Sequence, residues 1–211
     1  MSQLPFYEER KEVASYMKRL YDRHLTTASG GNISLRIDKD TFLITPTSLD
    51  KGNLTPELIA IVKFDGTNLT PNLKLSIETE MHREVLLARP DRNAVVHAHP
   101  VAACSFATAM PCQINTRLTA EAYFIMGDVE NVPYELMGTK KLADVVSRHI
   151  KDHEVLLMEN HGAITVGNNL LRAFDCMELL ERAAQMTLDV QLIKNSKCLD
   201  EEKLAQIRAM R

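Results

Sequence analysis

A hairpin pattern near the N-terminus constrains the fold more than any other feature of this chain. Two short segments with alternating or β-branched residues, 33–37 and 41–44, flank the turn-forming run Asp38-Lys39-Asp40. Such a pattern predicts two antiparallel strands joined by a tight turn. It disfavours a purely parallel, doubly wound sheet. We therefore expect one α/β domain over residues 1–211, with a central mixed or mainly antiparallel sheet flanked by helices.

Apolar periodicity predicts the remaining elements of this domain. Short apolar runs indicate further strands at 59–64, 94–97, 155–158 and 163–167. Apolar residues at helical spacing indicate helices at 6–24, 77–89, 101–109, 138–149 and 170–193, and a last helix that begins at Asp200. The segment 112–133 is ambiguous, although 119–126 reads as a short helix. No composition break or Gly/Ser-rich linker divides the chain.

The composition excludes several classes of protein. The chain has 211 residues, 45% of them hydrophobic, which is enough for a sizeable core and excludes a disordered chain. A net charge of -3 without long runs of one sign makes a nucleic acid or an anionic membrane an unexpected partner. No apolar run approaches the ~18 residues of a membrane span, and the charged N-terminal segment does not resemble a signal peptide. We expect a cytoplasmic protein whose four cysteines, which form no CxxC pair, are buried or inert thiols: Cys104, Cys112, Cys176 and Cys198.

The tripeptide His97-Ala98-His99 is the strongest indication of chemistry. Side chains two residues apart on a strand point to the same face, so both imidazoles could reach one metal ion. Taken alone, such a pair is more often a surface pair or a hydrogen-bonded core pair. Here it follows an apolar strand, and His161 occupies a comparable position before Gly162, at the end of another apolar strand. Three histidines at strand ends predict a three-ligand metal site with an open position.

Glu78 begins the helix that precedes the first of these strands. A glutamate in this position ordinarily interacts favourably with the helix dipole. If the strand returns the chain to the metal, Glu78 is instead the nearest candidate for a general base. Glu80 is its competitor, but two residues further along a helix its side chain faces another direction.

Three polar segments could bind a phosphate group: 29–32, 45–48 and 75–77. Small residues let backbone N–H groups approach an anion, and a helix that begins near Ile77 adds the positive end of its dipole. Each segment taken singly is merely a turn. The sequence physics alone leaves both interpretations open.

Together these motifs resemble the class II aldolase and adducin-head family, and most closely its L-fuculose-phosphate aldolase branch. The resemblance covers about residues 6–195 and is carried, in family order and at family spacing, by Ser29–Ser34, Leu43–Thr47, Ser76–His82, Arg89–Asp91, Ala94–His99 and Glu159–Gly162. It implies a zinc-dependent lyase of carbohydrate metabolism that acts on a sugar phosphate. It also implies a homotetramer with sites between subunits.

Carried over by position, the resemblance implies roles for particular residues. His97, His99 and His161 would ligate one zinc ion per chain. Glu78 would be the acid/base, and a further zinc ligand until substrate displaces it. The phosphate pocket would consist of Gly31, Asn32, Thr47, Ser48, Ser76 and Ile77. Ser48 replaces a usual glycine and Ile77 a usual serine, so backbone N–H contacts are expected at both positions.

The reaction that the resemblance favours is retro-aldol cleavage of L-fuculose 1-phosphate, or a related ketose 1-phosphate, to dihydroxyacetone phosphate and an aldehyde such as L-lactaldehyde. The family also offers L-ribulose-5-phosphate 4-epimerase and other pentulose-phosphate epimerases or dehydratases. A non-catalytic adducin-like binding module is a third alternative, which the presence of all three histidines and Glu78 disfavours. Tyr123 and Glu121 are candidates for the second acid, which would serve the aldehyde oxygen.

Overall fold

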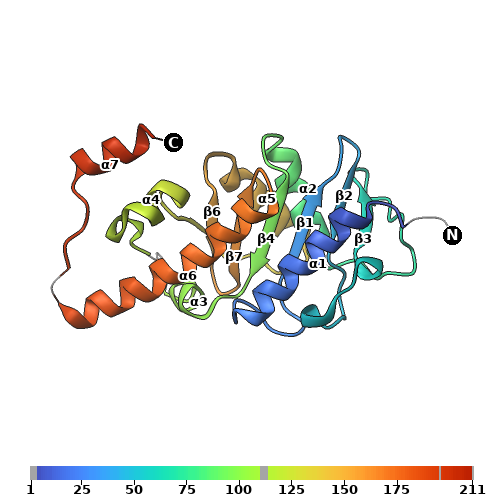
Figure 1. Cartoon of the computed structure of the whole chain (residues 1–211), viewed down its shortest axis with the longest axis horizontal. Coiled ribbons are helices and arrows are strands. Elements are labelled where there is room, and N and C mark those ends of the chain that lie inside the picture. Colours follow the sequence, from blue (N-terminus) through green and yellow to red (C-terminus); the bar gives the residue numbers. More distant parts are fainter. Residues whose placement is uncertain (1–3, 110–113, 195, 211) are drawn as a thin grey trace.

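The computed structural model describes residues 4–109, 114–194 and 196–210. Seven strands form one sheet in the order β3-β2-β1-β4-β7-β6-β5 (Figure 1). Their bounds are β1 Asn32–Arg36, β2 Thr41–Ile44, β3 Ala60–Lys63, β4 Ala94–Ala98, β5 Glu130–Val132, β6 Val155–Met158 and β7 Gly162–Gly167. Neighbouring strands are antiparallel except β5 and β6, which are parallel. The predicted α/β class with a mixed, mainly antiparallel sheet is confirmed.

Helices cover both faces of this sheet. The α-helices are α1 Tyr7–Asp22, α2 Thr79–Ala88, α3 Val101–Ala107, α4 Ala120–Met126, α5 Lys140–His149, α6 Leu170–Ile193 and α7 Glu201–Arg208. Short 3-10 helices occur at Lys51–Asn53, Pro56–Leu58, Thr116–Leu118 and Ile150–Asp152. One apolar core joins the sheet to α1, α3, α4 and α6, and a second joins it to α2 and α5. In Figure 1, α1 and α6 run across the near face of the sheet.

The alternation of side chains along β1 and β4 places polar groups on the α2 face of the sheet. In β1, Ile33 and Leu35 belong to the first core, so the alternate residues Asn32 and Ser34 face the other way. The register pairs Asn32 with His97 of β4. Polar residues from two adjacent strands therefore meet beneath the start of α2.

Several boundaries differ from the sequence prediction. The helix expected from residue 77 begins at Thr79, and the helix expected from 138 begins at Lys140. The short strand β5 was not predicted, because three residues within an ambiguous segment carry no periodicity. The helix predicted at 119–126 is confirmed as α4.

The cysteines that the structure describes lie in different environments. Cys176 is buried, Cys104 is half-buried and Cys198 is exposed. Burial, together with Glu181, raises the pKa of Cys104 to about 11, which makes that thiol unreactive. Cys112 lies outside the described residues. No helix of the described chain combines the length and apolarity that a membrane crossing requires.

Candidate active site

Three histidine side chains converge where β4 ends and β7 begins. His97 lies in β4, His99 follows that strand directly, and His161 immediately precedes β7. Because β4 and β7 pair antiparallel, the end of one strand lies beside the start of the other. One ring nitrogen from each histidine lies within 4.8 Å of the others, a grouping that could hold a metal ion.

Two glycines allow this close approach. A Cβ atom at Gly162 would lie 2.5 Å from Cδ2 of His99, so a side chain there would displace the ring. Gly31 has a φ of +66°, and a Cβ atom at that position would lie 2.7 Å from the carbonyl oxygen of His97. Gly162 therefore leaves space for the His99 ring, and Gly31 leaves space for the backbone of β4 at His97.

Glu78 reaches into the histidine cluster from the start of α2. Its Oε2 lies 3.3 Å from Nε2 of His97, and its Oε1 lies 2.9 Å from Nε2 of His161. The residue occupies the N-cap position of α2, but its side chain makes no capping hydrogen bond. Glu80 instead forms an ion pair with Arg83. The structure thus brings Glu78, and not Glu80, to the histidines.

The local electrostatics keep Glu78 ionised and the imidazoles of His97 and His99 neutral. Burial alone would raise the pKa of Glu78, but the contacts with His97 and His161 and a hydrogen bond from Asn32 outweigh it and lower that pKa. Burial lowers the pKa of His97, and it lowers the pKa of His99 to about 3. A carboxylate and neutral imidazoles are the forms that act as metal ligands.

The spacing of these donor atoms fits a single divalent cation. Zinc–nitrogen distances of about 2.0–2.1 Å in a tetrahedron imply roughly 3.4 Å between ligand atoms. His97 Nε2 and His99 Nε2 are 3.1 Å apart, and the two contacts of Glu78 are of similar length. His97 Nδ1 donates to the carbonyl of Ala163, which turns its Nε2 lone pair toward the cluster. Apart from its ion-pair contact with His161 Nε2, Glu78 Oε1 has no hydrogen-bond partner among the described residues despite its burial.

A chain of buried hydrogen bonds orients Glu78. The Nδ2 of Asn32 donates to Glu78 Oε2 at 2.8 Å, while its Oδ1 accepts from Nε2 of His82. Nδ1 of the same imidazole then accepts from the hydroxyl of Ser34. Burial lowers the pKa of His82 to about 3, so the ring is neutral and one tautomer satisfies both contacts. His82 therefore lies directly behind Asn32 and fixes the orientation of its amide.

The three predicted phosphate segments lie together. Asn32 donates to the hydroxyl of Ser76 at 3.1 Å. The N–H of Ile33 donates to the hydroxyl of Thr45, and the N–H of Thr45 donates back to the carbonyl of Ile33. The N–H of Thr47 donates to the carbonyl of Lys74, close to Ser76 in the chain. Hydrogen bonds therefore connect all three segments at one side of the histidine cluster.

The pocket residues differ in exposure. Gly31, Asn32 and Ser76 are buried, whereas Thr47 is half-buried and Ser48 is exposed. Ser48 has a φ of +61°, the left-handed conformation that glycine adopts most readily. The side chain of Ile77 is exposed, which leaves its backbone as the group available to an anion.

The two candidates for the second acid lie on α4. Tyr123 is buried, and its hydroxyl oxygen accepts a hydrogen bond from Arg208 of α7. Glu121 lines a small cavity with Arg182 of α6. Within the described part of one chain, neither side chain contacts the three histidines or Glu78. Their assignment stays a prediction.

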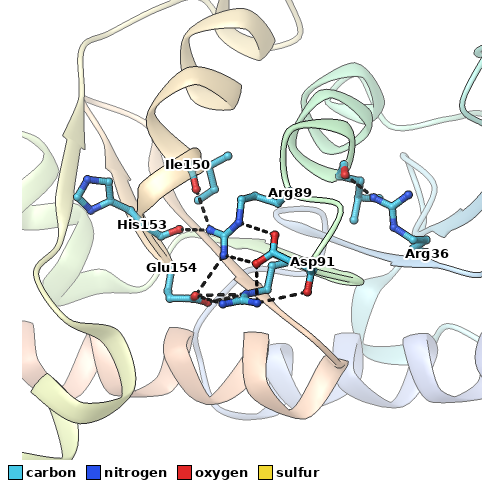
Figure 2. A network of polar contacts seen from close by, with 8 residues as sticks. Arg36, Arg89, Asp91, Ile150, His153 and Glu154 are labelled. Carbon is cyan, nitrogen blue, oxygen red and sulfur yellow. Dashed lines mark hydrogen bonds and ion pairs between the residues drawn. The ribbon is translucent and has the colours of Figure 1, made fainter. Parts of the chain in front are cut away.

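A second charged cluster lies at the other end of β4. It includes the motif Arg89–Asp91, to which the sequence alone assigned no contacts. Figure 2 shows Arg89 between Asp91, Glu154 and the carbonyls of Ile150 and His153. Its Nη1 donates to those carbonyls at 2.9 and 2.8 Å, and its Nε donates to Asp91 at 2.9 Å. This arginine network fastens the end of α2 to the segment before β6.

Known proteins match most of the length of this chain. The sequence pattern of the family "Class II Aldolase and Adducin N-terminal domain" matches residues 11–188. The 5-deoxy-D-ribulose 1-phosphate aldolase of Bacillus thuringiensis is 33% identical, over 95% of this chain and 93% of the relative. The L-fuculose phosphate aldolase of Methanococcus maripaludis is 33% identical, over 87% and 98%. The 3-oxo-tetronate 4-phosphate decarboxylase of Haemophilus influenzae is 30% identical, over 86% and 88%.

Solved structures share the whole fold. YgbL of Escherichia coli, described as a putative aldolase, epimerase or decarboxylase, superposes with a TM-score of 0.90 at 27% identity, over 96% of this chain and 98% of that one. An L-fuculose 1-phosphate aldolase superposes with a TM-score of 0.87 at 24% identity, over 100% and 99%. The arrangement of strands and helices is therefore that of these proteins.

Proposed function

We propose that this chain, which belongs to the class II aldolase and adducin family, cleaves a ketose 1-phosphate by a metal-dependent retro-aldol reaction. The chain is an enzyme of the lyase class, in a family that depends on a metal. One observation carries the proposal: a buried carboxylate, Glu78, lies against His97 and His161 where three imidazoles converge. A non-catalytic binding module has no need of such a group.

We assign the metal as zinc, held by His97, His99 and His161, with Glu78 as a further ligand before substrate binds. When bound, the ion supplies a Lewis acid that draws charge from a substrate carbonyl. The histidine nitrogens suit zinc. No lysine is needed to form a Schiff base in such a reaction.

Glu78 is the proton carrier of this proposal. In the direction of cleavage, the C3–C4 bond breaks and the second acid/base group takes the proton of the C4 hydroxyl as the aldehyde forms. The acid form of Glu78 delivers a proton to C3 of the fragment that becomes dihydroxyacetone phosphate. In the direction of synthesis, its carboxylate removes the same proton. The hydrogen bond from Asn32 holds one carboxylate oxygen, so the group keeps one orientation during both transfers.

L-Fuculose 1-phosphate is the substrate we place first, with dihydroxyacetone phosphate and L-lactaldehyde as its products. The relatives named for L-fuculose phosphate and for 5-deoxy-D-ribulose 1-phosphate support a ketose phosphate, and they differ in the aldehyde portion of the sugar. Phosphate would be held by the segments of Gly31 and Asn32, Thr47 and Ser48, and Ser76 and Ile77. We also propose a cytoplasmic homotetramer, in which Tyr123 or Glu121 could approach a site on another subunit.

Decarboxylation is the second candidate reaction. A relative at 30% identity is named 3-oxo-tetronate 4-phosphate decarboxylase. Loss of carbon dioxide beside a carbonyl leaves negative charge at the same position as retro-aldol cleavage, so the same electrophile would serve both. Epimerisation of L-ribulose 5-phosphate is the third.

A substrate panel tests these alternatives directly. The zinc-loaded protein is incubated with L-fuculose 1-phosphate, L-rhamnulose 1-phosphate, 5-deoxy-D-ribulose 1-phosphate, L-ribulose 5-phosphate and 3-oxo-tetronate 4-phosphate. Dihydroxyacetone phosphate, epimer and carbon dioxide are then measured. We expect dihydroxyacetone phosphate from at least one ketose 1-phosphate. Decarboxylation of 3-oxo-tetronate 4-phosphate also leaves dihydroxyacetone phosphate, so the test depends on which substrate releases it. Carbon dioxide from that acid or epimer from L-ribulose 5-phosphate, with no dihydroxyacetone phosphate from any ketose 1-phosphate, would overturn the proposal.

A further inference from the structure

Lys51 is a buried cation that the proposed reaction does not use. It is only 1% exposed, although it begins a short 3-10 helix in a polar loop. Desolvation of an ammonium group costs several kcal/mol unless other groups compensate. A lysine in a loop could usually extend its charged end into water. Its complete burial therefore needs an explanation from its surroundings.

The contacts of Lys51 join two of the three phosphate segments. Its ammonium nitrogen donates to the carbonyl of Pro46 at 2.5 Å, in the segment that contains Thr47. Its backbone N–H donates to the carbonyl of Ala28 at 2.8 Å, directly before the segment that contains Gly31. Lys51 therefore fixes these two segments relative to each other.

The ammonium group is only partly satisfied. Among the described residues, Pro46 is the one acceptor for its three N–H groups, and no carboxylate lies within ion-pair distance. Glu78 attracts it over a longer distance. A buried cation with unused hydrogen-bonding capacity is suited to interact with an additional anion.

The residues proposed for the pocket carry no positive charge of their own. Its six residues are Gly31, Asn32, Thr47, Ser48, Ser76 and Ile77, and all of them are uncharged. A sugar phosphate brings close to two negative charges, next to a site that already contains the Glu78 carboxylate. Charge interactions act more strongly in a buried environment than in water, so one cation beneath the pocket would offset much of this repulsion.

We infer that Lys51 is a positioning residue for the phosphate group of the substrate: it shapes the loop at Pro46 and Thr47 and supplies positive charge from beneath the pocket. This inference rests on the proposed function, because it presumes a phosphorylated substrate in that pocket. Burial lowers the pKa of Lys51 to about 8, and Glu78 opposes that shift. The ammonium form therefore predominates at neutral pH.

A matched pair of variants tests the inference. Lys51→Met keeps the length of the side chain and removes its charge. Lys63→Met makes the same change at an exposed position. Lys63 pairs with Thr41 at the end of β3 farther from the pocket, whereas Ala60 at the other end pairs with Ile44, next to Thr45. The probe is inorganic phosphate, whose dissociation constant is measured by titration calorimetry on the zinc-loaded protein.

We expect Lys51→Met to raise the dissociation constant of phosphate about tenfold, the usual effect of losing a charge-assisted interaction. Lys63→Met should leave it unchanged. KM for a phosphorylated ketose should rise in parallel, with kcat altered less than about threefold and KM for the unphosphorylated sugar unaffected. Unchanged phosphate affinity in a folded, zinc-loaded Lys51→Met protein would overturn the inference.

A second variant separates charge from loop packing and covers the case in which Lys51→Met fails to fold. Lys51→Gln keeps an N–H donor for the Pro46 carbonyl but carries no charge. Its phosphate affinity should fall as well, and wild-type affinity would overturn the charge contribution. Because phosphate binding is measured without turnover, a protein that cleaves no ketose phosphate can still support the inference. Conversely, cleavage with an unchanged KM in Lys51→Met would overturn it and leave the proposed reaction standing.

Discussion

The two ends of β4 carry two charged clusters of opposite character. Before the strand begins, the guanidinium of Arg89 donates to two carbonyls and two carboxylates, and Glu154 also accepts from Arg92. After the strand, His97, His99 and His161 crowd around Glu78 with nitrogen and oxygen atoms directed at one point. The first cluster pairs its charges and hydrogen-bonding groups within the chain, whereas the second brings potential metal ligands together.

This difference separates a structural cluster from a functional one. The side chains of the arginine network contain no buried nitrogen or oxygen without a hydrogen bond among the described residues. At the other end, Glu78 Oε1 and His161 Nδ1 are buried without one. Unsatisfied buried polar groups reduce stability, so their persistence beside a cluster of potential ligands indicates a site for binding or chemistry.

The largest expected effect is at Glu78. Glu78→Gln should lower kcat about 10²–10⁴-fold, because a general acid–base group is lost while the shape of the site is kept. Exchange of the C3 proton of dihydroxyacetone phosphate with solvent deuterium, measured without an aldehyde, isolates this step. Folding and zinc bound by the three histidines should largely persist. Full zinc content with a wild-type exchange rate would show that another residue is the base, and Glu80→Gln would be the next variant to measure.

The next largest effect should be at Arg89, before the start of β4. It should concern the stability of the fold and not the reaction. Arg89→Met leaves the carbonyls of Ile150 and His153 without their donor, which should lower the free energy of unfolding by about 2–3 kcal/mol. Urea unfolding measures this loss. Zinc content and turnover per folded molecule should stay at wild-type levels. A loss of zinc at unchanged stability would contradict the division between the two clusters.

A smaller effect concerns the pH dependence of stability and the buried His82. Its pKa is about 3 in the folded chain, compared with 6.5 for a histidine side chain that is fully exposed to water. The contribution of His82 to the free energy of unfolding is therefore complete above pH 6.5. It is lost as the pH falls toward 3, because in this range the unfolded state binds a proton at this histidine and the folded state does not. Each pH unit in this window costs about 1.4 kcal/mol. His82→Gln should remove that part of the slope, and parallel slopes for the two proteins between pH 6.5 and 4.5 would refute the assignment.

The smallest effect should be at Ser76. Ser76→Ala removes one hydroxyl from the proposed phosphate pocket and leaves the hydrogen bond between Asn32 and Glu78 in place. KM for the phosphorylated ketose should rise at least about tenfold, since a hydrogen bond to a charged group is worth roughly 1.5–3 kcal/mol. KM for the unphosphorylated sugar serves as the control. Equal changes for both sugars would place the phosphate elsewhere.

The sequence predicted the strands that support the site, because these elements depend on local patterns. A hairpin, apolar strands and the spacing of His97 and His99 are visible within a few residues. His161 and Glu78 could be named as candidates because each lies at the predicted end of an element. Their contact depends on strand order, which periodicity does not contain.

Other parts of the site depend on long-range packing and were not predictable in this way. Lys51 stands between an aspartate and a glycine, a context typical of an exposed turn, and nothing local indicates its burial. His82 could be recognised as part of a helix, but its contact with Asn32 joins residues 50 positions apart. The strand β5 is stabilised by its parallel pairing with β6 and not by its own composition.

The strand order also determines when, during synthesis, the site can first exist. β7 lies between β4 and β6, so its two neighbours in the sheet precede it in the chain. A ribosome that has translated only as far as β6 has produced His97, His99 and Glu78, but His161 and the strand that aligns it are still missing. The nascent chain therefore holds an incomplete set of the proposed ligands until Gly167 has emerged from the exit tunnel. Acquisition of a metal by these residues would in this way be a late event, coupled to the closing of the sheet.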